Sequence, residues 1–393
     1  MLDMRLELAG TTVEAPPHPV YGPVGARPDP GSRLLAEAAE AVETEAAAAR
    51  AGAVLAVNMA PDPALAVWSA AGAPLWVQDE RASAMAYARA LLAAPGPEAD
   101  LRLAVAPELA FPPEGAVVAL VNLRYLWGRQ PLRDTLAAAL AGLRPGGRLL
   151  LAGANDRGVR SAADDLAAAS GATPEVLGYG KGHRLIAVTR PTARSARAPA
   201  PALTEPVTAE AAGVRMRLRR VPGLFAEGLP DPGTRLLIDT VPAASPDQDV
   251  LDLGCGGGAV ALAAALRQPL ARIWAVDDSL RAVRAAAANA EANGAAGRLR
   301  ALHGDGLDVL PPGLRLDIIA VNPPYHFGAI ATTALAERWL RAAPDRLRRG
   351  GRLYVVYNRF LPYLRVLEEV FGRDAATLLA DADGYRVAGA VRG

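Results

Sequence analysis

The sequence predicts an α/β fold in two tandem domains, each built on a mostly parallel, twisted sheet with helices on both faces. Both halves alternate short runs of β-branched or other apolar residues with long segments rich in Ala, Leu and Arg that have helical periodicity, which is typical of repeated βαβ units. At 393 residues the chain is too long for one average domain and suits two, each large enough to bury its own core. Matching segments in the two halves point to the same conclusion.

Three pairs of segments indicate that the halves arose by duplication. PDPGSRLLAEA, which begins at Pro28, matches PDPGTRLLIDT, which begins at Pro230, at an offset of 202. LRPGGRLLL matches LRRGGRLYV at an offset of 204, and VNLRYLWG matches VNPPYHFG at an offset of 200. Between the halves, residues 191–206 contain Pro, Ala and Ser without apolar periodicity, as in a stiff, exposed linker. We therefore expect domains at 1–190 and 207–393.

The elements of the second half follow in order. Residues 249–255, DVLDLGC, predict a strand, and a Gly-rich turn leads into a helix at 259–267. Residues 271–277 predict the next strand, and 279–294 predict a helix closed by its final glycine. Residues 315–322, RLDIIAVN, predict a strand that runs directly into two prolines. The ends of these strands are where open α/β sheets bind ligands.

Composition places the chain among globular proteins. Hydrophobic residues make up 51% and charged residues 21%, which is close to the average for soluble domains. The first ten residues do not form a signal peptide, no apolar run of 18 residues follows, and Cys255 as the single cysteine excludes an internal disulfide. We expect a cytoplasmic protein without membrane contact. The net charge of +1 means that any nucleic-acid site must be local.

The loop DLGCGGG predicts a nucleoside cofactor. Its glycines let the backbone approach a ligand closely, and Asp277, at the end of the next strand, can accept hydrogen bonds from ribose hydroxyls. Gly254, Gly256 and Ala259 also satisfy the loose dinucleotide pattern. However, Asp252 would repel a pyrophosphate and would suit the cationic end of S-adenosyl-L-methionine (AdoMet). The loop therefore favours AdoMet, and a tight turn without ligand is the structural alternative.

The first half has lost this loop. The corresponding stretch, AVLAVNMAPDPA at 53–64, contains no glycine, although Trp76 and Asp79 match Trp274 and Asp277 at an offset of 198. The fold is expected to persist without the pocket. We predict that the first domain binds no AdoMet.

The segment NPPY predicts a site for a planar amino or amide group. Two prolines hold a turn rigid and present carbonyl oxygens without N–H groups. If the Asn322 side-chain oxygen and the Pro323 carbonyl accept the two hydrogens of such a group, its nitrogen can face a sulfonium methyl, and Tyr325 can stack on the ring. The first half has NLRY here, so Pro324 and its neighbour were lost together with the glycines. A plain strand-to-loop turn is the alternative.

The chain also resembles a known family, the tandem-domain ribosomal RNA small-subunit guanine-N2 methyltransferases of the RsmC type. The resemblance spans both halves and is specific in the second, through GLFAEGLPDPGTRLL, DLGCGGG, NPPYHFG and NRFLPYLRVLEEVFG. It implies two Rossmann-like class I methyltransferase domains. The first would be degenerate, without cofactor, and would support folding and RNA recognition, whereas the second would methylate a guanine amino group with AdoMet. No metal is expected.

The resemblance also implies roles for particular residues. Asp252, Gly254 and Gly256 would line the methionine end of AdoMet, Asp277 would hold its ribose and Asp305 would face its adenine. The guanine would be held by Asn322, Pro323, Pro324 and Tyr325, where family members usually have Phe at the last position. The segment that closes over the cofactor in similar enzymes contains Phe225 and Asp231.

Candidate RNA contacts lie outside these motifs. Arg215, Arg217 and Arg219 alternate in VRMRLRRV and would share one face of a strand, either as a basic stripe for phosphates or as the solvated face of a protected edge. His326 is a further candidate for positioning the base, although a turn histidine is more often structural. The arginines at 341–352 are interpreted as charges at a helix end.

The expected substrate is ribosomal RNA or the small ribosomal subunit, and the internal duplication favours a monomer. Three alternatives remain at this stage. Closely similar tandem enzymes act on large-subunit RNA, a glutamine amide would fit the same cradle in a protein-glutamine methyltransferase, and the chain could be a non-catalytic RNA-binding assembly factor.

Overall fold

The computed structural model divides into two compact units, the first up to Pro201 together with Phe327–Ile330, and the second from Ala202 without that segment. The residues it describes are 4–16, 28–41, 52–72, 74–93, 99–104, 109–126, 128–192, 206–327 and 330–393. The boundary between the units falls within the expected linker, of which 193–205 lie outside the described residues. Within the described part of the chain, no helix is both long and apolar enough to cross a membrane.

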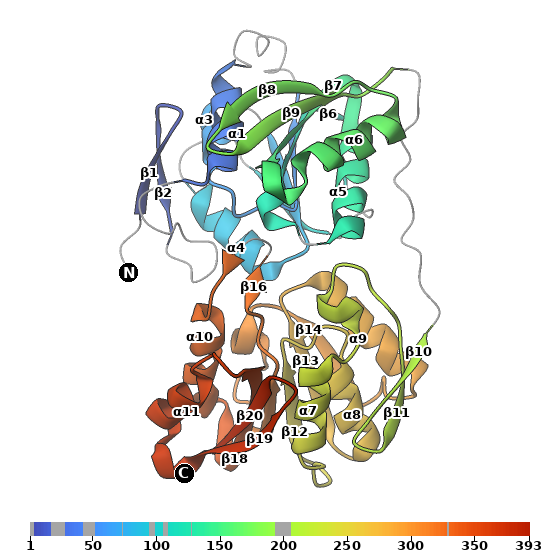
Figure 1. Ribbon diagram of the computed structural model, residues 1–393, viewed down its shortest axis with the longest axis vertical. Helices are drawn as coiled ribbons and strands as arrows, with labels where there is room; N and C mark the ends of the chain where they lie inside the picture. Colours follow the sequence, from blue (N-terminus) through green and yellow to red (C-terminus); the bar gives the residue numbers. More distant parts are fainter. Residues whose placement is uncertain are drawn as a thin grey trace. The chain divides into compact units, whose positions relative to one another are not determined.

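The first unit contains a seven-stranded sheet of order β5-β4-β3-β6-β7-β9-β8, of which Figure 1 labels β6, β7, β8 and β9. Its parallel strands are β3 (Val54–Val57), β4 (Leu75–Asp79), β5 (Asp100–Leu103), β6 (Ala116–Asn122) and β7 (Leu143–Ala154). Antiparallel strands complete one edge, β8 (Glu175–Gly180) and β9 (His183–Thr189). The remaining elements are the hairpin β1 (Met4–Leu8) and β2 (Thr11–Ala15) and the helices α1 (Pro30–Ala41), α3 (Ala64–Ala70), α4 (Ala82–Leu91), α5 (Arg129–Gly142) and α6 (Val159–Ser170).

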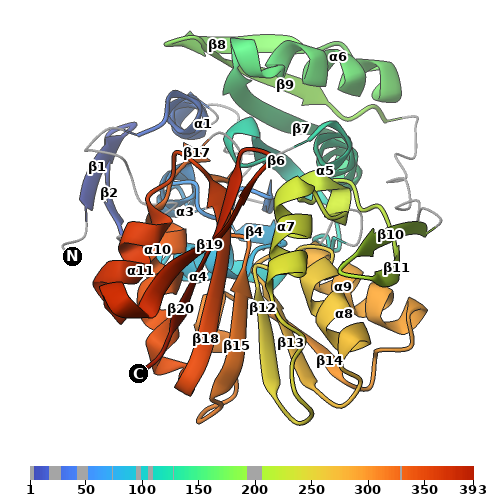
Figure 2. The ribbon, with the colours of Figure 1, turned by 60° about the horizontal axis from the view of Figure 1, so that its bottom comes forward.

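The second unit repeats this order as β14-β13-β12-β15-β18-β20-β19, and Figure 2 shows β14 to β18 side by side. The strands are β12 (Asp249–Leu253), β13 (Arg272–Asp277), β14 (Leu299–His303), β15 (Leu316–Val321), β18 (Leu347–Asn358), β19 (Ala376–Ala382) and β20 (Tyr385–Val391). The helices are α7 (Pro232–Thr240), α8 (Ala259–Arg267), α9 (Leu280–Ala292), α10 (Ala334–Ala342) and α11 (Tyr363–Phe371). Two small hairpins are added, β10 (Val207–Ala211) with β11 (Val214–Leu218) and β16 (His326–Phe327) with β17 (Ile330–Ala331).

Both units confirm the predicted fold class. A buried apolar cluster joins one sheet face of the second unit to its helices, with Leu237 from α7 and Leu262 from α8 packed with Ala320 and Val356 from the sheet. The predicted strands and helices of this unit occur within two residues of their expected bounds. The strand expected at 249–255 ends earlier, at Leu253, because the chain turns at the next residue with a φ of 76°.

The sheet register brings the expected site residues to one edge. The parallel strand β12 pairs Asp252 with Ala320 of β15, and β13 pairs Asp277 with His303 of β14. Because parallel strands end at the same edge, the loops that follow β12, β13, β14 and β15 lie next to one another. These loops contain the Gly-rich turn, Asp305 and Asn322.

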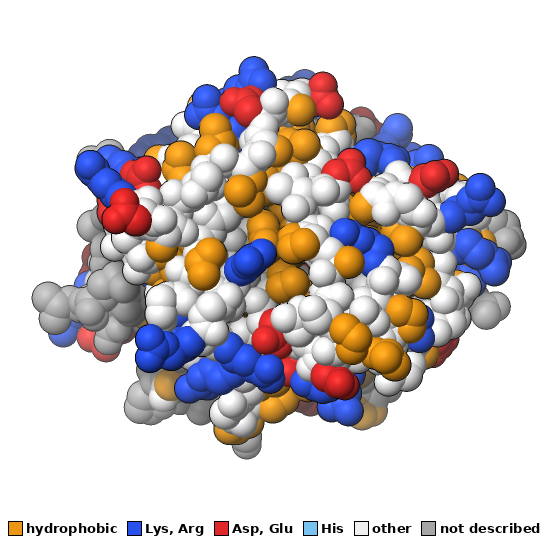
Figure 3. Space-filling view, turned by 90° about the horizontal axis from the view of Figure 1, so that it is seen from below, with side chains coloured by type: hydrophobic (Ala, Val, Ile, Leu, Met, Phe, Trp, Pro, Cys, Tyr) orange, Lys and Arg blue, Asp and Glu red, His pale blue; other side chains and the backbone are white. Residues whose placement is uncertain are grey.

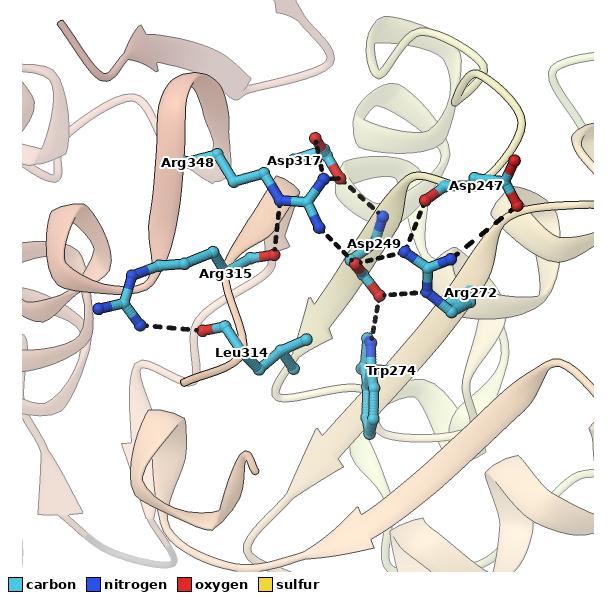
Figure 4. A network of polar contacts seen from close by, with 8 residues as sticks. All are labelled: Asp247, Asp249, Arg272, Trp274, Leu314, Arg315, Asp317 and Arg348. Atoms are coloured by element: carbon cyan, nitrogen blue, oxygen red, sulfur yellow. Dashed lines mark hydrogen bonds and ion pairs between the residues drawn. The ribbon is translucent and has the colours of Figure 1, made fainter. Parts of the chain in front are cut away.

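A network of charges surrounds Asp249 at the opposite side of this sheet, where the parallel strands begin (Figure 4). The carboxylate of Asp249 accepts hydrogen bonds from Arg272 (2.9 and 2.8 Å), from Trp274 (3.2 Å) and from Arg348 (3.0 Å). Burial would raise the pKa of Asp249, but the Arg272 and Trp274 hydrogen bonds and the charges of Arg272 and Arg348 outweigh it and lower that pKa. The helix-end interpretation of 341–352 is wrong for Arg348, Arg349 and Arg352, which lie in β18.

Candidate active site

The Gly-rich loop between β12 and α8 is held by backbone contacts. The N–H groups of Gly254 and Cys255 both donate to the Val276 carbonyl, at 2.8 and 3.0 Å. A Cβ atom at Gly257 would lie 2.2 Å from the Gly228 carbonyl oxygen, so only glycine lets the short helix η3 (Phe225–Gly228) approach this loop. The Cys255 side chain is buried, which raises the pKa of its thiol well above the usual range and agrees with a filling role.

Two carboxylates meet at this loop. Asp277 accepts hydrogen bonds from the Gly256 N–H at Oδ2 (2.9 Å) and from the Ser279 N–H at Oδ1 (2.8 Å). Asp252 is 3% exposed, and its Oδ2 accepts the Ala261 N–H at 2.9 Å. Burial raises the pKa of Asp252 to about 7, and the Asp277 charge adds to this effect, against the opposing effect of the Ala261 hydrogen bond. A cation at the loop would therefore be stabilised, whereas a pyrophosphate would be repelled.

Helix α10 supplies two residues that no sequence motif indicates. Arg338 forms an ion pair with Asp305, which precedes the short helix η4 (Gly306–Val309), so contact of Asp305 with adenine stays a prediction. Trp339 is buried, and its ring would lie 3.3 Å from a Cβ at Gly254 and its Nε1 2.5 Å from one at Gly306. The indole therefore packs against both the Gly-rich loop and the loop that contains Gly306. The amphipathic pattern of the helix gives Trp339 an ordinary core position, and no local signal places it here.

The Asn322 side chain has a fixed partner. Its Nδ2 donates to Thr234 Oγ1 at 2.9 Å, and Asn322 is half-buried directly after β15. The turn that follows contains Pro323, Pro324 and Tyr325, each half-buried. This arrangement leaves the side-chain oxygen as the group with which Asn322 can accept a hydrogen bond.

Tyr325 has an aromatic neighbour. Its ring centroid lies 5.9 Å from that of Phe360, at an interplanar angle of 71°. Phe360 follows β18 and is 71% exposed. It stands in NRFLPYLRVLEEVFG, a segment that carries the family resemblance but does not indicate a role for this ring. The pair forms an aromatic surface beside Asn322.

Phe225 and Asp231 lie in the segment before α7, as expected. Phe225 is 71% exposed in η3. Asp231 is the N-cap of α7, where its Oδ1 accepts the Thr234 N–H at 2.9 Å. Contact of either residue with the cofactor stays a prediction, and capping accounts for Asp231 in this structure.

Comparisons with known proteins agree with this geometry. Residues 215–389 match the family model of the methyltransferase small domain. A ribosomal RNA small subunit methyltransferase C from Chromohalobacter salexigens is 37% identical over 73% of this chain and 81% of its own length. The protein of the same name from Pseudomonas entomophila is 32% identical over the same shares.

The chain belongs to the ribosomal RNA small subunit methyltransferase C family. This confirms the resemblance seen in the sequence. A solved structure described as the Thermus thermophilus 16S rRNA N2 G1207 methyltransferase (RsmC), in complex with AdoMet and guanosine, matches 100% of this chain and 98% of its own. Its TM-score is 0.79 at 28% identity, so the tandem arrangement of this family member covers both units described above.

The first unit keeps the loop shape of the second unit but has a large side chain beside it. Asn58, which follows β3, has a φ of 52°, and the Ala60 N–H donates to Asp79 Oδ2 at 3.2 Å. These features match the φ of Gly254 and the hydrogen bond from Gly256. Arg81, however, donates to both carboxylate oxygens of Asp79, at 2.8 and 2.6 Å.

The first unit also uses its asparagine differently. Asn122 Oδ1 accepts the backbone N–H of Arg124 at 3.0 Å, and the Arg124 side chain forms an ion pair with Asp29 at 2.9 Å. Pro324 stands at the position of Arg124 and has no N–H. The proline therefore removes the donor that would otherwise occupy the Asn322 oxygen.

The expected basic stripe occurs as a strand face for Arg215 and Arg217, whereas Arg219 lies after the end of β11 and is half-buried. Arg215 and Arg217 are exposed in β11, and Met216 between them is buried. The other edge of β11 is covered by α9, because the N–H groups of Arg217 and Arg219 donate to asparagine side chains at 2.9 and 3.0 Å. Phosphate binding by these arginines stays a prediction.

The structure adds little on other candidate RNA contacts. Figure 3 shows basic side chains scattered among acidic and apolar ones on the face seen from below. The side chain of His326 lies outside the described residues. Among the described residues, no group of three or more His, Cys, Asp or Glu side chains is arranged to hold a metal.

Proposed function

We propose that this chain transfers a methyl group from AdoMet to the exocyclic N2 amino group of a guanine in 16S ribosomal RNA. The observation that carries the proposal is the state of Asn322, whose amide nitrogen is bound by Thr234 at 2.9 Å and whose oxygen meets no N–H from the next-but-one residue, Pro324. The result is an oriented acceptor at the carboxyl end of a strand. In the first unit, where the Gly-rich loop is absent, the same acceptor is occupied.

The second unit fits AdoMet. The ligand would lie along the loop of Gly254 and Gly256, with its positive end near Asp252 and its ribose at Asp277. When bound, AdoMet supplies an electrophilic methyl group on a sulfonium. The two carboxylates favour a cation there, since the buried Asp252 has a pKa raised to about 7 and gains stability when a positive charge arrives. Asp305, Phe225 and Asp231 are proposed to border the remainder of the cofactor.

The amino group would be held by two oxygens. Asn322 Oδ1 and the Pro323 carbonyl accept its two hydrogens, which turns the nitrogen lone pair toward the methyl group. The nitrogen gains the methyl carbon as the S–C bond breaks, and the methylated nitrogen then loses one proton to water. Tyr325 stacks on the base, which stabilises binding by roughly 1–3 kcal/mol. No strong base is required, because the nitrogen becomes acidic once it is methylated.

The substrate must present its guanine outside a duplex. A paired base cannot enter such a turn, so the target is single-stranded, flipped out or in RNA that has not finished assembly. Arg215, Arg217, Arg219 and His326 are proposed contacts to this RNA. We further propose that the first unit supports folding and RNA recognition without cofactor, and that the protein acts as a cytoplasmic monomer.

A transfer assay with tritium-labelled AdoMet tests the proposal. The acceptors are 16S RNA, small subunits, 23S RNA and a peptide release factor, and mass spectrometry locates the methyl group. The expected result is N2-methylguanine in 16S RNA alone, with loss of rate on the order of 10²–10³ in Asn322→Ala, by analogy with removal of an oxyanion-hole donor. Label in 23S RNA or in glutamine would show that the substrate is large-subunit RNA or a protein and not 16S RNA. Label in none of the acceptors would indicate a non-catalytic RNA-binding factor.

A further inference from the structure

A chain of hydrogen bonds links Asp231 to Asn322 through Thr234. Asp231 Oδ1 accepts both the backbone N–H of Thr234, at 2.9 Å, and its hydroxyl, at 2.5 Å. The Thr234 oxygen in turn lies 2.9 Å from Asn322 Nδ2. Thr234 is buried at the start of α7, so the contacts lie in the interior.

The directions of these bonds follow from the number of protons. A threonine hydroxyl has one proton, and here the Asp231 carboxylate, which can only accept, takes it. Thr234 Oγ1 can therefore only accept from Asn322, and the end of the amide that faces it must be the NH₂ group. The amide oxygen is then turned away from Thr234.

We propose that Thr234, with its proton held by Asp231, is a positioning residue that sets the orientation of the Asn322 amide. The two ends of an asparagine side chain have nearly the same size but opposite hydrogen-bonding character. If the NH₂ end faced the substrate, a donor would meet the donor hydrogens of the guanine amino group. This chain of hydrogen bonds from Asp231 through Thr234 to Asn322, here called the relay, therefore decides whether Asn322 presents an acceptor or a donor to its substrate. The inference depends on the guanine-N2 activity proposed above.

The first unit supports this reading by contrast. Asn122 Nδ2 donates to Asp62 Oδ2 at 2.8 Å, and the hydroxyl of Ser32, which stands at the position of Thr234, is 3.5 Å away. Asp29, at the position of Asp231, also accepts the backbone N–H of its hydroxyl residue, Ser32, at 3.2 Å, but its other oxygen binds Arg124. The amide of Asn122 is therefore held directly by a carboxylate, whereas the amide of Asn322 is held by the Thr234 hydroxyl in the unit whose acceptor oxygen is left open by a proline.

The test uses the full chain and two substitutions at one position. Thr234→Val keeps the shape and removes the hydroxyl, whereas Thr234→Ser keeps the hydroxyl. We expect Thr234→Val to lower kcat about 10- to 100-fold, as for residues that orient metal ligands, with the AdoMet dissociation constant within about twofold of the wild type. Thr234→Ser should retain kcat within about threefold, and Ser32→Ala in the first unit is the matched control.

A second measurement does not depend on activity. In protein labelled with ¹⁵N-asparagine, the side-chain NH₂ signal of Asn322, assigned by its loss in Asn322→Ala, should be protected from hydrogen exchange in the wild type and lose that protection in Thr234→Val. Unchanged protection together with unchanged kcat would overturn the relay. A wild-type protein that shows the protected signal but methylates no guanine would overturn the proposed activity and leave the relay standing.

Discussion

Arg81 donates two hydrogen bonds to the carboxylate of Asp79, the residue that corresponds in the first unit to Asp277. The position of Arg81 is taken in the second unit by Ser279, whose short side chain cannot extend over the carboxylate. Arg81 therefore covers the carboxylate of Asp79, whereas the residue at its position in the second unit is too short to reach over Asp277 in the same way.

We predict that the full chain binds one molecule of AdoMet, because this difference leaves one usable loop. Isothermal titration calorimetry should give a stoichiometry of one. Asp277→Ala should weaken binding strongly, whereas Asp79→Ala should leave the affinity and the stoichiometry unchanged. A stoichiometry of two would mean that Arg81 moves aside and that the first unit is a second site.

Replacing Pro324 by alanine should reduce the methyl-transfer rate. The alanine N–H can donate to Asn322 Oδ1 as the Arg124 N–H donates to Asn122 at 3.0 Å. One hydrogen bond of about 0.5–1.5 kcal/mol that must be broken for substrate to bind predicts a loss in kcat/KM of roughly two- to tenfold. Arg124→Ala, which keeps its backbone N–H, is the control in the same assay. An unaltered kcat/KM in Pro324→Ala would mean that the N–H does not reach the amide.

Phe360→Ala should raise the KM for RNA and leave AdoMet binding unchanged. The exposed ring beside Tyr325 extends the surface on which a base can stack, a contact of roughly 1–3 kcal/mol, which corresponds to about 5- to 150-fold in KM. Phe360→Tyr should behave as the wild type. Leu270 is 67% exposed in the turn before β13 at the far edge of the sheet, and Leu270→Ala controls for the loss of an exposed apolar side chain.

AdoMet affinity should rise with pH and level off above about pH 7. In the ligand-free protein the pKa of Asp252 is raised to about 7 by burial, so the carboxyl holds its proton below that pH. A cationic ligand favours the carboxylate and must displace this proton, which predicts roughly tenfold weaker binding per pH unit below 7. Titrations from pH 5.5 to 8.5 should show this slope in the wild type. The slope should vanish in Asp252→Asn and persist in Asp62→Asn, which removes a carboxyl of raised pKa from the first unit.

The same group has an effect on the stability of the free protein. Between the ordinary aspartate pKa and about 7, the folded state binds a proton that the unfolded state has released, so this contribution to stability falls as pH rises through that window. Saturating AdoMet should reverse that loss. A ligand affinity without pH dependence would place Asp252 away from the positive charge.

Asp249→Asn should lower the free energy of unfolding at pH 7 by about 1–3 kcal/mol, since two arginines and an indole lose a charged acceptor. The pKa of Asp249 is lowered in the folded state, so its contribution is present above the ordinary aspartate pKa and is lost as pH falls through the lowered value. Urea unfolding at pH 7 and pH 3 should therefore show a smaller difference at the lower pH. Asp247, which is 89% exposed and 4.0 Å from Arg272, supplies the control, and Asp247→Asn should have no measurable effect.

The main chain of the second unit was largely predictable from sequence. The strands β12, β13 and β15 have apolar runs that end at glycine or at a polar residue, and their parallel pairing places Asp252, Asp277 and Asn322 at one edge. Contacts between side chains distant in sequence were not predictable. Arg338 at Asp305, Trp339 behind the glycines and Phe360 at Tyr325 come from elements whose own patterns indicate ordinary helices and turns.

Several polar contacts of single side chains were also not predicted. Asp231 was assigned to the cofactor from the resemblance, although Asp-Pro-Gly-Thr is also a recognisable helix start. The link from Thr234 to Asn322 spans 88 residues, and no periodicity in the sequence reports it. The Arg-rich run follows a helix, and this position suggested that Arg348 is a helix-end charge. Its partners, Asp249 and Asp317, lie instead in strands of the sheet.

The positive φ shared by Asn58 and Gly254 has a consequence for the engineering of the chain. Asparagine tolerates this conformation better than most residues, so the bend does not require a glycine at Asn58. The backbone of the loop in the first unit therefore keeps the bend, and the difference from the second unit lies in the side chains beside it. The first unit is therefore a natural starting point for engineering a second ligand site. Replacing Arg81 and Arg124 with smaller residues would be the first step.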